Sequence, residues 1–500
     1  MKITLISPNI VSQKGDVAGT GIPYIPVSMI YLATFLKQKK QTIQVIDTFS
    51  ENPFKITEKK GFLFQGIKPE ETINKIKKGT ELIILYAAQV YAHKSLIDIL
   101  AQIRKQETTK KIPVLIIENT QAVTAYSLQH EYKDFLNKGA DYVLSGEAEP
   151  RILNFIDMLK GKKKETEIDG LIWKEKKTGK IKLNPKLIFQ NPDELPFPDW
   201  DLINLKNYWK LGYAHAPLTE KKYLPILTSR GCPLICEFCV VPATNEKKWR
   251  PRSPKNVVQE LEKNSKKYGV KEFHIEDLNP TVDRRRIVEL CKLIIKKKLK
   301  LNMKFAAGTK AETFDLNTIE WMAKAGFTYI SISPESGSPR VLKLMRKYFN
   351  HEQALQQVKK MDELNITSQA CIVLGFPGET QEDLKMTQQY VKKLAKAGLD
   401  EVALFIMTPV PGSATFDKIA PGYKDISELT FTPKWRKEYK NLVKWRAKIL
   451  TSFVATKTIH HPIKIAQNIA NLLSGKYKTK TEMTISRILK THYLFRKRDK

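Results

Sequence analysis

Two long stretches of this sequence alternate short, apolar, β-branched runs with segments of helical periodicity, and this alternation restricts the chain to α/β folds built on parallel sheets. In the first stretch the strand-like runs fall at 2–8, 42–47, 81–87, 113–120 and 142–146. Helical segments separate them. The pattern predicts a doubly wound parallel sheet, whose ligand would lie past the carboxyl ends of the strands at the switch in strand order. From periodicity alone, a sheet that binds nothing stays open as an alternative.

The second stretch repeats the alternation with six apolar runs and five helical segments between them. The strand-like runs fall at 223–229, 272–277, 303–308, 329–335, 369–376 and 401–409. Strands that are apolar on both faces, joined by helices, predict a closed or partly closed parallel barrel of the (β/α)6 type. Chemistry in such a barrel collects at the carboxyl ends of its strands.

Between the two stretches lie a predicted hairpin and a stiff linker. Residues 170–185 place two polar-apolar runs on either side of Thr178 and Gly179, and residues 191–201 contain three prolines within seven positions. We therefore predict four parts: a sheet domain at 1–160, a hairpin and linker at 161–220, a barrel at 221–420 and a C-terminal extension at 421–500.

The C-terminal extension is strongly basic. Residues 434–500 carry 18 Lys or Arg and 3 Asp or Glu, a large share of the net charge of +33 on the 500-residue chain. Aromatic and aliphatic residues recur among them at roughly helical spacing, which predicts basic amphipathic helices. The favoured interpretation is a helical cap over the barrel. Docking on an anionic membrane comes second and nucleic acid last, and genome composition or a thermophilic surface also explains excess Lys.

The cysteines indicate a reducing compartment. Only five occur, and three of them, Cys232, Cys236 and Cys239, lie within eight residues, so they do not form a disulfide framework. The N-terminus lacks the pattern of a signal peptide, and no apolar window reaches the roughly 18 residues of a spanning helix. We predict a cytoplasmic protein, with peripheral attachment to the inner face of the membrane as an option.

The three clustered cysteines follow the first predicted barrel strand, in the order C-x-x-x-C-x-x-C. Soft thiolate ligands on one short loop favour an iron-sulfur cluster or zinc. A structural zinc site needs four ligands, and no second Cys or His pair follows at the usual spacing. A four-iron cube held by three cysteines leaves one iron open for a substrate atom. Spacing alone favours iron-sulfur and leaves a redox or incomplete zinc site as the alternative.

These motifs resemble those of the radical S-adenosylmethionine (SAM) enzymes, and within them the cobalamin-dependent class. The resemblance covers about residues 1–415. Its carriers in the barrel half are RGCPLICEFC (230–239), IEDLNPTVD (275–283), SPESGSPRVLKLMRK (333–347), LGFPGETQEDL (374–384) and TPVPGSATFD (408–417). PYIPVSMIYLATFLK (23–37) and GADYVLSGEAEPRI (139–152) resemble the companion domain that precedes the barrel in that class.

The resemblance implies a role for each matching residue. Cys232, Cys236 and Cys239 would bind a four-iron, four-sulfur cluster, whose free iron binds SAM. The positions implied to contact SAM are Phe238, Ser333, Glu335, Ser336, Gly375, Phe376 and Pro377. Of the adjacent Glu276 and Asp277, at most one faces the site, because neighbours on a strand point to opposite faces, and we favour Glu276.

The implied reaction is reductive cleavage of SAM to a 5′-deoxyadenosyl radical, with a ferredoxin or flavodoxin as electron donor. In the cobalamin-dependent class, a methyl group carried on cobalt is then transferred to a substrate carbon. Two departures bear on cobalamin: the chain lacks a D-x-H-x-x-G motif, and Glu118, Asn119 and Thr120 replace a Gly-Gly found in many relatives.

Several alternatives remain at this point. The leading activity is C-methylation of an unactivated carbon in a small-molecule or lipid substrate. Radical carbon-carbon bond formation, cyclisation or oxidation of a lipid or tetrapyrrole is the second, and a non-catalytic nucleic-acid-binding protein with a structural metal loop is the third. We expect Cys291 and Cys371 to pack as small apolar residues, with a thiol-radical role for Cys371 left open, and His274 and His351 to be structural.

Overall fold

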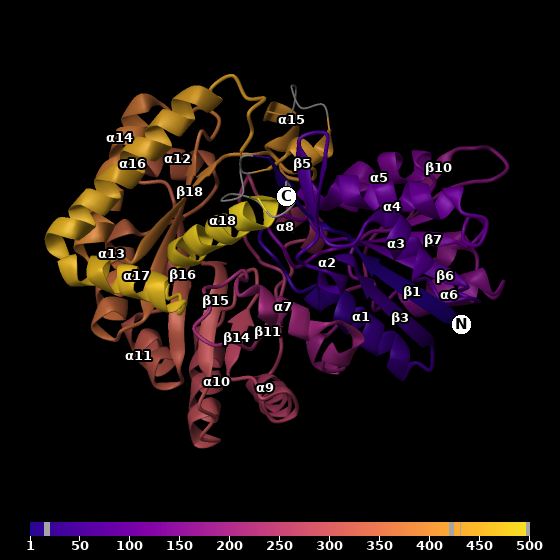
Figure 1. Ribbon diagram of the computed structural model, residues 1–500, viewed down its shortest axis with the longest axis horizontal. Coiled ribbons are helices and arrows are strands. Elements are labelled where there is room, and N and C mark those ends of the chain that lie inside the picture. The colour runs from indigo at the N-terminus through magenta and orange to yellow at the C-terminus, as the bar shows by residue number, and fades with distance from the viewer. Residues whose placement is uncertain (15–20, 420–424, 431, 497–500) are drawn as a thin grey trace.

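The structure is a computed structural model that describes residues 1–14, 21–419, 425–430 and 432–496 (Figure 1). Its N-terminal part is built on a seven-stranded sheet with the order β10-β9-β8-β7-β6-β1-β3. Five of these strands are parallel: β1 (Lys2–Ser7), β3 (Thr42–Asp47), β6 (Leu82–Ala87), β7 (Val114–Glu118) and β8 (Tyr142–Leu144). All five match predicted strands. The order of strands reverses between β1 and β6, which is where a doubly wound sheet binds its ligand.

Helices cover both faces of this sheet because its strands are apolar on both sides. Leu5 of β1 packs into one core with α1 (Val27–Gln38) and α6 (Ile152–Leu159), whereas its neighbour Ile6 packs into a second core on the other face. That second core contains α3 (Pro69–Asn74), α4 (His93–Lys105) and α5 (Leu128–Asn137). The doubly wound prediction is confirmed.

The predicted hairpin is also present, and it belongs to the same sheet. Strands β9 (Leu171–Lys174) and β10 (Ile181–Leu183) are antiparallel, and β9 pairs with β8. The N-terminal sheet therefore continues beyond residue 160. The four boundaries that we drew along the chain stay predictions.

A small antiparallel sheet escaped prediction. It has the order β2-β5-β4 and consists of β2 (Ile10–Gln13), β4 (Ile56–Lys59) and β5 (Phe62–Gln65). Each strand has four residues, which is too short for an alternation to be recognised.

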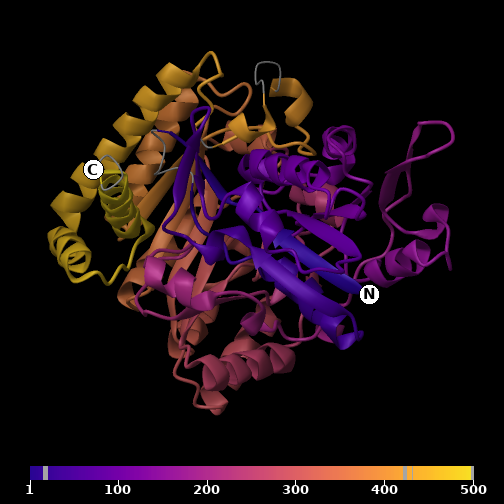
Figure 2. The ribbon, with the colours of Figure 1, turned by 45° about the vertical axis from the view of Figure 1, so that its right-hand side comes forward.

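The second half of the chain forms a six-stranded parallel sheet in sequence order. Its strands are β11 (Tyr223–Ile226), β14 (Glu272–Ile275), β15 (Asn302–Thr309), β16 (Phe327–Glu335), β17 (Thr367–Leu374) and β18 (Glu401–Ile406). The connecting helices are α9 (Pro254–Tyr268), α10 (Arg284–Lys296), α11 (Leu316–Lys324), α13 (His351–Glu363) and α14 (Gln381–Lys396). Strands β11 and β18 are the two edges and do not pair, so this is a partial barrel (Figure 2).

Shorter elements connect these units. They are α2 (Thr48–Glu51), α7 (Leu205–Leu211), β12 (Ser229–Arg230), α8 (Val241–Asn245), β13 (Arg250–Pro251), α12 (Pro339–Leu344) and α15 (Phe416–Ile419).

The C-terminal extension is helical, as predicted. Helix α16 (Tyr439–His460) packs against α14 and β18, and α17 (Pro462–Ser474) follows it around the rim of the barrel. Helix α18 (Lys480–Arg496) then turns back and lies between the barrel and the N-terminal part (Figure 1). Among the described residues, no helix combines the length and the apolar character that crossing a membrane requires.

Buried ion pairs join the two halves of the molecule. Arg230, just before the cysteine loop, lies 2.8 Å from Glu149 and 3.4 Å from Glu147, and Arg250 pairs with Glu147 at 2.6 Å. The two acids come from the GEAEP segment of the N-terminal part, so the loop after β8 holds the start of the cysteine loop.

Candidate active site

A cavity of about 530 Å³ lies between the carboxyl ends of the two sheets. Its walls come from three regions. The N-terminal part contributes residues at or just after the ends of β1, β3, β6 and β7, including Asn9, Asp47, Ala88, Asn119 and Gln121. The barrel contributes strand ends and the cysteine loop, and α18 contributes Lys480, Thr481, Thr484 and Ile485. The volume is that of a small-molecule or cofactor site. The cavity is therefore where both sheets were expected to hold ligands.

The cysteine loop forms one wall of this cavity. Cys232, Cys236 and Cys239 all line it and are half-buried. The loop begins at Gly231, which has a φ of +79° and stands so close to the backbone of Lys248 that a Cβ would lie 2.0 Å from its carbonyl oxygen. Only glycine fits such an approach.

Glu237 fastens the middle of the loop. Its backbone N–H donates to the carbonyl of Met345 at 3.0 Å, and its carboxylate pairs with Arg346 at 3.0 Å and Lys418 at 3.3 Å. Because Glu237 stands between two of the cysteines, these contacts fix the direction in which the thiols point.

The three thiols are chemically suited to a metal cluster. None forms a disulfide, and burial raises the pKa of each, so without a metal they carry their protons. The Lys347 ammonium acts against this rise at all three. Among the described residues, no three His, Cys, Asp or Glu side chains converge as ligands of a single metal ion. A four-iron cube binds each thiolate at a separate iron, so its ligands need not converge on one point.

Asn279 adds a polar group beside the first cysteine. Its side-chain nitrogen lies 4.0 Å from the sulfur of Cys232, and its side-chain oxygen is buried without a hydrogen-bond partner in the described structure. A buried polar atom without a partner is costly, so this amide is free to bind a ligand in the cavity.

Glu335 and Ser333, two predicted SAM contacts at the end of β16, also line the cavity. Glu335 has a left-handed backbone, with a φ of 60°, and its carboxylate receives a hydrogen bond from Lys347 at 2.6 Å. Ser333 faces Gly308 so closely that a Cβ on Gly308 would meet its hydroxyl oxygen at 2.0 Å. A left-handed backbone is unfavourable for glutamate, which indicates that the site, and not the strand, determines the conformation of Glu335.

Phe238 lines the cavity as expected, whereas the remaining predicted SAM contacts lie elsewhere in this structure. Ser336 is buried and accepts a hydrogen bond from the backbone N–H of Ser338. Gly375 packs against Leu442 of α16 and its carbonyl accepts from Arg436, and Phe376 is buried in the core. Pro377 completes this turn without lining the cavity. The roles of these positions stay predictions.

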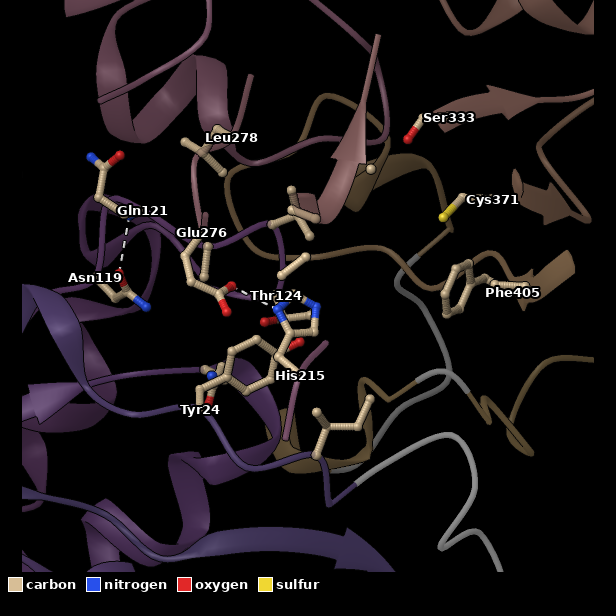
Figure 3. Close-up of a pocket in the computed structure, with 18 of the residues that line it drawn as sticks. Tyr24, Asn119, Gln121, Thr124, His215, Glu276, Leu278, Ser333, Cys371 and Phe405 are labelled. Carbon is tan, nitrogen blue, oxygen red and sulfur yellow. Dashed lines mark hydrogen bonds and ion pairs between the residues drawn. The ribbon is translucent and has the colours of Figure 1, made fainter. Parts of the chain in front are cut away.

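A histidine and a carboxylate meet on the cavity wall just after the end of β14 (Figure 3). The ring nitrogen Nδ1 of His215 lies 2.6 Å from Glu276, and the ring of Tyr24 lies 4.4 Å from the imidazole. Burial lowers the pKa of His215. Burial acts to raise the pKa of Glu276, but His215, His274 and Lys480 together outweigh it, so the pKa of Glu276 is lowered. The carboxylate is thus charged and the imidazole neutral, so Nδ1 donates to Glu276.

The neighbouring Asp277 points the other way, as the alternation along a strand requires. Its carboxylate accepts hydrogen bonds from the backbone N–H and the hydroxyl of Thr228 at 2.6 and 2.7 Å. Glu276 therefore faces the cavity and Asp277 holds the chain at the end of β11.

The other cysteines and histidines considered in the sequence analysis differ in whether they line the cavity. Cys291 is fully buried in the barrel core, and His274 is buried and bonded to Glu272. The ring nitrogen Nε2 of His351 donates to the carbonyl of Ser336, just after β16, at 2.9 Å. Cys371, in contrast, lines the cavity near Ser333, where burial raises its pKa to about 11 (Figure 3).

Tyr24, His215 and Lys480 were missed by the sequence analysis. Tyr24 lies in the quoted segment 23–37, but no spacing marked its side chain, and only the fold brings it together with His215 and Lys480. Lys480 lies at the start of α18, and its ammonium donates to the carbonyl of Ala306 at 2.7 Å across the cavity mouth.

Comparison with known proteins agrees with these features. The profile of the radical SAM superfamily matches residues 226–391, which contain the cysteine loop and four of the six barrel strands, β14 to β17. An uncharacterized methyltransferase of Pyrococcus horikoshii is 30% identical over 298 residues, which are 59% of this chain and 61% of that protein. Cytidylyl-2-hydroxyethylphosphonate methyltransferase of Streptomyces wedmorensis is 24% identical over 479 residues, which are 88% of this chain and 86% of that protein.

Two solved structures share the fold of both halves. The cobalamin-dependent radical SAM enzyme OxsB, with aqua-cobalamin bound, superposes with a TM-score of 0.62 at 18% identity, covering 90% of this chain and 56% of that one. The radical SAM methyltransferase TsrM of Kitasatospora setae, with cobalamin and a [4Fe-4S] cluster bound, gives 0.63 at 15% identity, covering 84% and 74%. The chain thus spans less than two thirds of the length of the Pyrococcus protein and of OxsB.

Residues 226–391 thus form a radical SAM domain, with three free cysteines on the loop after the first barrel strand, and the chain has the two-part fold of the cobalamin-dependent radical SAM enzymes OxsB and TsrM.

Proposed function

We propose that this protein is a radical SAM methyltransferase that transfers a methyl group to an unactivated carbon of a small organic substrate. The observation that carries the proposal is the cavity itself. One wall holds the three free cysteines, and the opposite wall is the carboxyl edge of a doubly wound sheet at its switch point. A site between a cluster loop and a nucleotide-type sheet suits an enzyme that uses two cofactors together.

Cys232, Cys236 and Cys239 would hold the four-iron, four-sulfur cluster, which supplies the electron that cleaves SAM to a 5′-deoxyadenosyl radical. Glu335 and Ser333 lie at the end of β16 and Asn279 follows β14, all on the cavity wall. They offer a carboxylate, a hydroxyl and an amide that can bind the amino and hydroxyl groups of SAM. Phe238 and Leu278 provide apolar surface beside them.

Cobalamin fits the other wall. The residue Glu118, which replaces a glycine of many relatives, does not enter the cavity: its carboxylate accepts hydrogen bonds from the backbone N–H groups of Leu128 and Gly146, each at 2.6 Å. The edge that does face the cavity includes Ala88, Ala122 and Val123, and Val123 is 52% exposed. Asn119 and Gln121 line the same edge, so it is mixed; its open apolar part suits the face of a large ring, and the cofactor would supply the methyl group.

The proposed reaction needs a one-electron donor such as a ferredoxin or a flavodoxin, and we propose a cytoplasmic location for it. The test is anaerobic purification with cobalamin supplied, followed by iron, sulfide and corrinoid analysis and by an assay for 5′-deoxyadenosine formed from SAM under dithionite. Cys236→Ala removes one cluster ligand. Cys291→Ala, in the barrel core, is the matched control.

We expect the wild-type protein and Cys291→Ala to bind about four irons and to form 5′-deoxyadenosine, and Cys236→Ala to lose at least 90% of that product. Equal behaviour of all three proteins would refute radical chemistry. A cluster that cleaves SAM in a protein without corrinoid would refute methyl transfer through cobalamin and favour radical cyclisation, bond formation or oxidation.

A further inference from the structure

The cysteine loop has an outer face as well as the inner face that lines the cavity. Ile235 lies between two of the cysteines and is 44% exposed. Leu344 at the end of α12 and Tyr348 just beyond it are 41% and 70% exposed. Three such side chains are unusual beside a metal-binding loop, because large apolar groups are more often buried.

These residues form one surface. The backbone N–H of Glu237, two positions after Ile235, donates to the carbonyl of Met345, which directly follows Leu344. Glu237 also accepts from the backbone N–H of Thr415, so the segment entering α15 lies against the loop. We call this surface, made of Ile235, Lys343, Leu344, Arg346, Tyr348 and Lys418, the loop face.

The loop face is positively charged. Lys343, Arg346 and Lys418 are exposed, and two of them share the single, nearly buried carboxylate of Glu237. Exposed apolar and aromatic groups within a rim of Lys and Arg are typical of a surface that binds an acidic protein.

The loop face includes part of the cysteine loop itself, since Ile235 directly precedes Cys236. Lys347 stands between Arg346 and Tyr348, but its own side chain is buried and turned inward, where it lines the cavity with the cysteines and its ammonium donates a hydrogen bond to Glu335 at 2.6 Å. One short segment thus has one side chain toward the cysteines and its two neighbours toward solvent. Because electron transfer slows steeply with distance, a donor bound here would be well placed to reach the cluster.

We propose that the loop face is the docking site for the electron donor, a small acidic one-electron carrier protein. This inference rests on the proposed function, since only reductive cleavage of SAM needs such a donor. The step is balanced: the carrier loses one electron, the oxidised cluster gains it, and no proton or bond is exchanged between the two proteins.

The test compares two reductants on the same protein. The probes are a reduced acidic flavodoxin, which must bind the protein surface before it can transfer an electron, and dithionite, a small molecule that does not need a docking surface. The variants are Lys343→Glu, Tyr348→Ala and the double variant. No described interaction joins the side chain of Lys343 or of Tyr348 to a cysteine or to Glu237. Lys177→Glu, in the exposed turn between β9 and β10, is the matched charge-reversal control.

For each variant, the initial rate of cluster bleaching by flavodoxin is divided by the rate with dithionite, at 20 mM and at 500 mM salt. We expect the ratio to fall roughly three- to tenfold for Lys343→Glu at low salt, and further for the double variant, because charge reversal slows a steered association. The difference should shrink at high salt, where screening removes the steering. Lys177→Glu should match the wild type.

An unchanged ratio in the double variant at low salt would overturn the assignment of the loop face, while SAM cleavage with dithionite would still support the proposed function. Vesicles rich in phosphatidylglycerol serve as a competitor. If they bind through Lys343 while flavodoxin does not, the face is a lipid site and the proposal is wrong. Absence of 5′-deoxyadenosine with both reductants, from protein with a full cluster, would instead refute the proposed function.

Discussion

The protonation state of the His215 imidazole in the cavity depends on its neighbours. Two opposing effects act on it: burial lowers its pKa, and the charge of Glu276 raises it. Burial is the larger. His93 shows the contrasting structural case, since both of its ring nitrogens have partners, Tyr126 and Asp134, away from the cavity.

Substitution of Glu276 by Gln should lower the pKa of His215 further, because it removes the carboxylate and leaves burial in place. Nuclear magnetic resonance of histidine-labelled protein, titrated without cofactors, measures this directly. If the His215 resonance of the variant titrates at a higher pH than that of the wild type, the ion pair is not as described.

Asp47 is a second buried carboxyl on the cavity wall. Burial raises its pKa to about 6, although the hydroxyl of Tyr208 donates to it at 2.7 Å. Between about pH 4 and 6, Asp47 therefore keeps a proton in the folded protein that it has already lost in the unfolded chain. This group therefore stabilises the fold at low pH, and its contribution disappears as the pH rises through 6.

Relative to Asp47→Asn, the wild type should lose roughly 3 kcal/mol of stability between pH 4 and pH 7, with no further change above that. Thermal unfolding of both proteins at several pH values gives the comparison. A difference in midpoint that stays constant with pH would show that Asp47 is ionised throughout.

For single residues, the sequence predicted those whose role follows from their spacing along the chain. The three cysteines could be found because cluster ligands must come from one short loop, and Glu276 because strand alternation leaves one of two acids facing inward. Tyr24 and His215 could not, since they lie in loops 191 positions apart and meet only after both halves have folded.

Helix α18 is the element that closes the cavity. Glu401, at the start of β18, accepts hydrogen bonds from the backbone N–H groups of Lys480 and Thr481 at 3.0 and 2.8 Å, and from the Thr481 hydroxyl. A carboxylate on the first N–H groups of a helix stabilises that end. These hydrogen bonds hold the start of α18 against the mouth of the barrel.

Glu401→Gln should weaken these bonds and let the start of α18 open more often. Hydrogen-deuterium exchange of the peptide spanning 480–489 should quicken by roughly tenfold, the size of one lost charge-assisted hydrogen bond. Glu320→Gln, on the exposed surface pair with Lys360, serves as the control. Equal exchange in both variants would show that Glu401 does not hold the helix.

Long elements were predictable and short ones were not. Every predicted barrel strand is present, because strand-like runs of six to nine residues that alternate with helical segments fit few other folds. Strands β2, β4 and β5 have four residues each and are stabilised by one another rather than by their own pattern. The position of α18 depends on Glu401, about 80 residues earlier in the chain, which no local pattern records.

At the scale of the molecule, the cavity exists only while the two halves stay together, and a buried network of charges joins them. Arg230 and Glu149 are both nearly inaccessible to solvent, and the guanidinium also lies over the ring of Tyr31. Such pairs contribute little net stability, but removing one partner leaves an uncompensated charge.

Glu149→Gln should therefore destabilise the junction by about 3–5 kcal/mol. Limited proteolysis reports it, through faster cleavage in the 191–201 linker. Glu58→Gln breaks an exposed pair with Lys14, which is worth about 1 kcal/mol or less, and should leave the cleavage rate unchanged. Equal rates for the two variants would mean that other contacts hold the halves together.

The central claim is that three cysteines bind a cluster with one iron left for SAM, and electron paramagnetic resonance of the reduced, reconstituted protein tests it most directly. Saturating SAM should change the g-values of the cluster signal in the wild type and in Cys291→Ala. A fully assembled cluster whose spectrum is identical with and without SAM would contradict the account, because every iron would then already have its ligands.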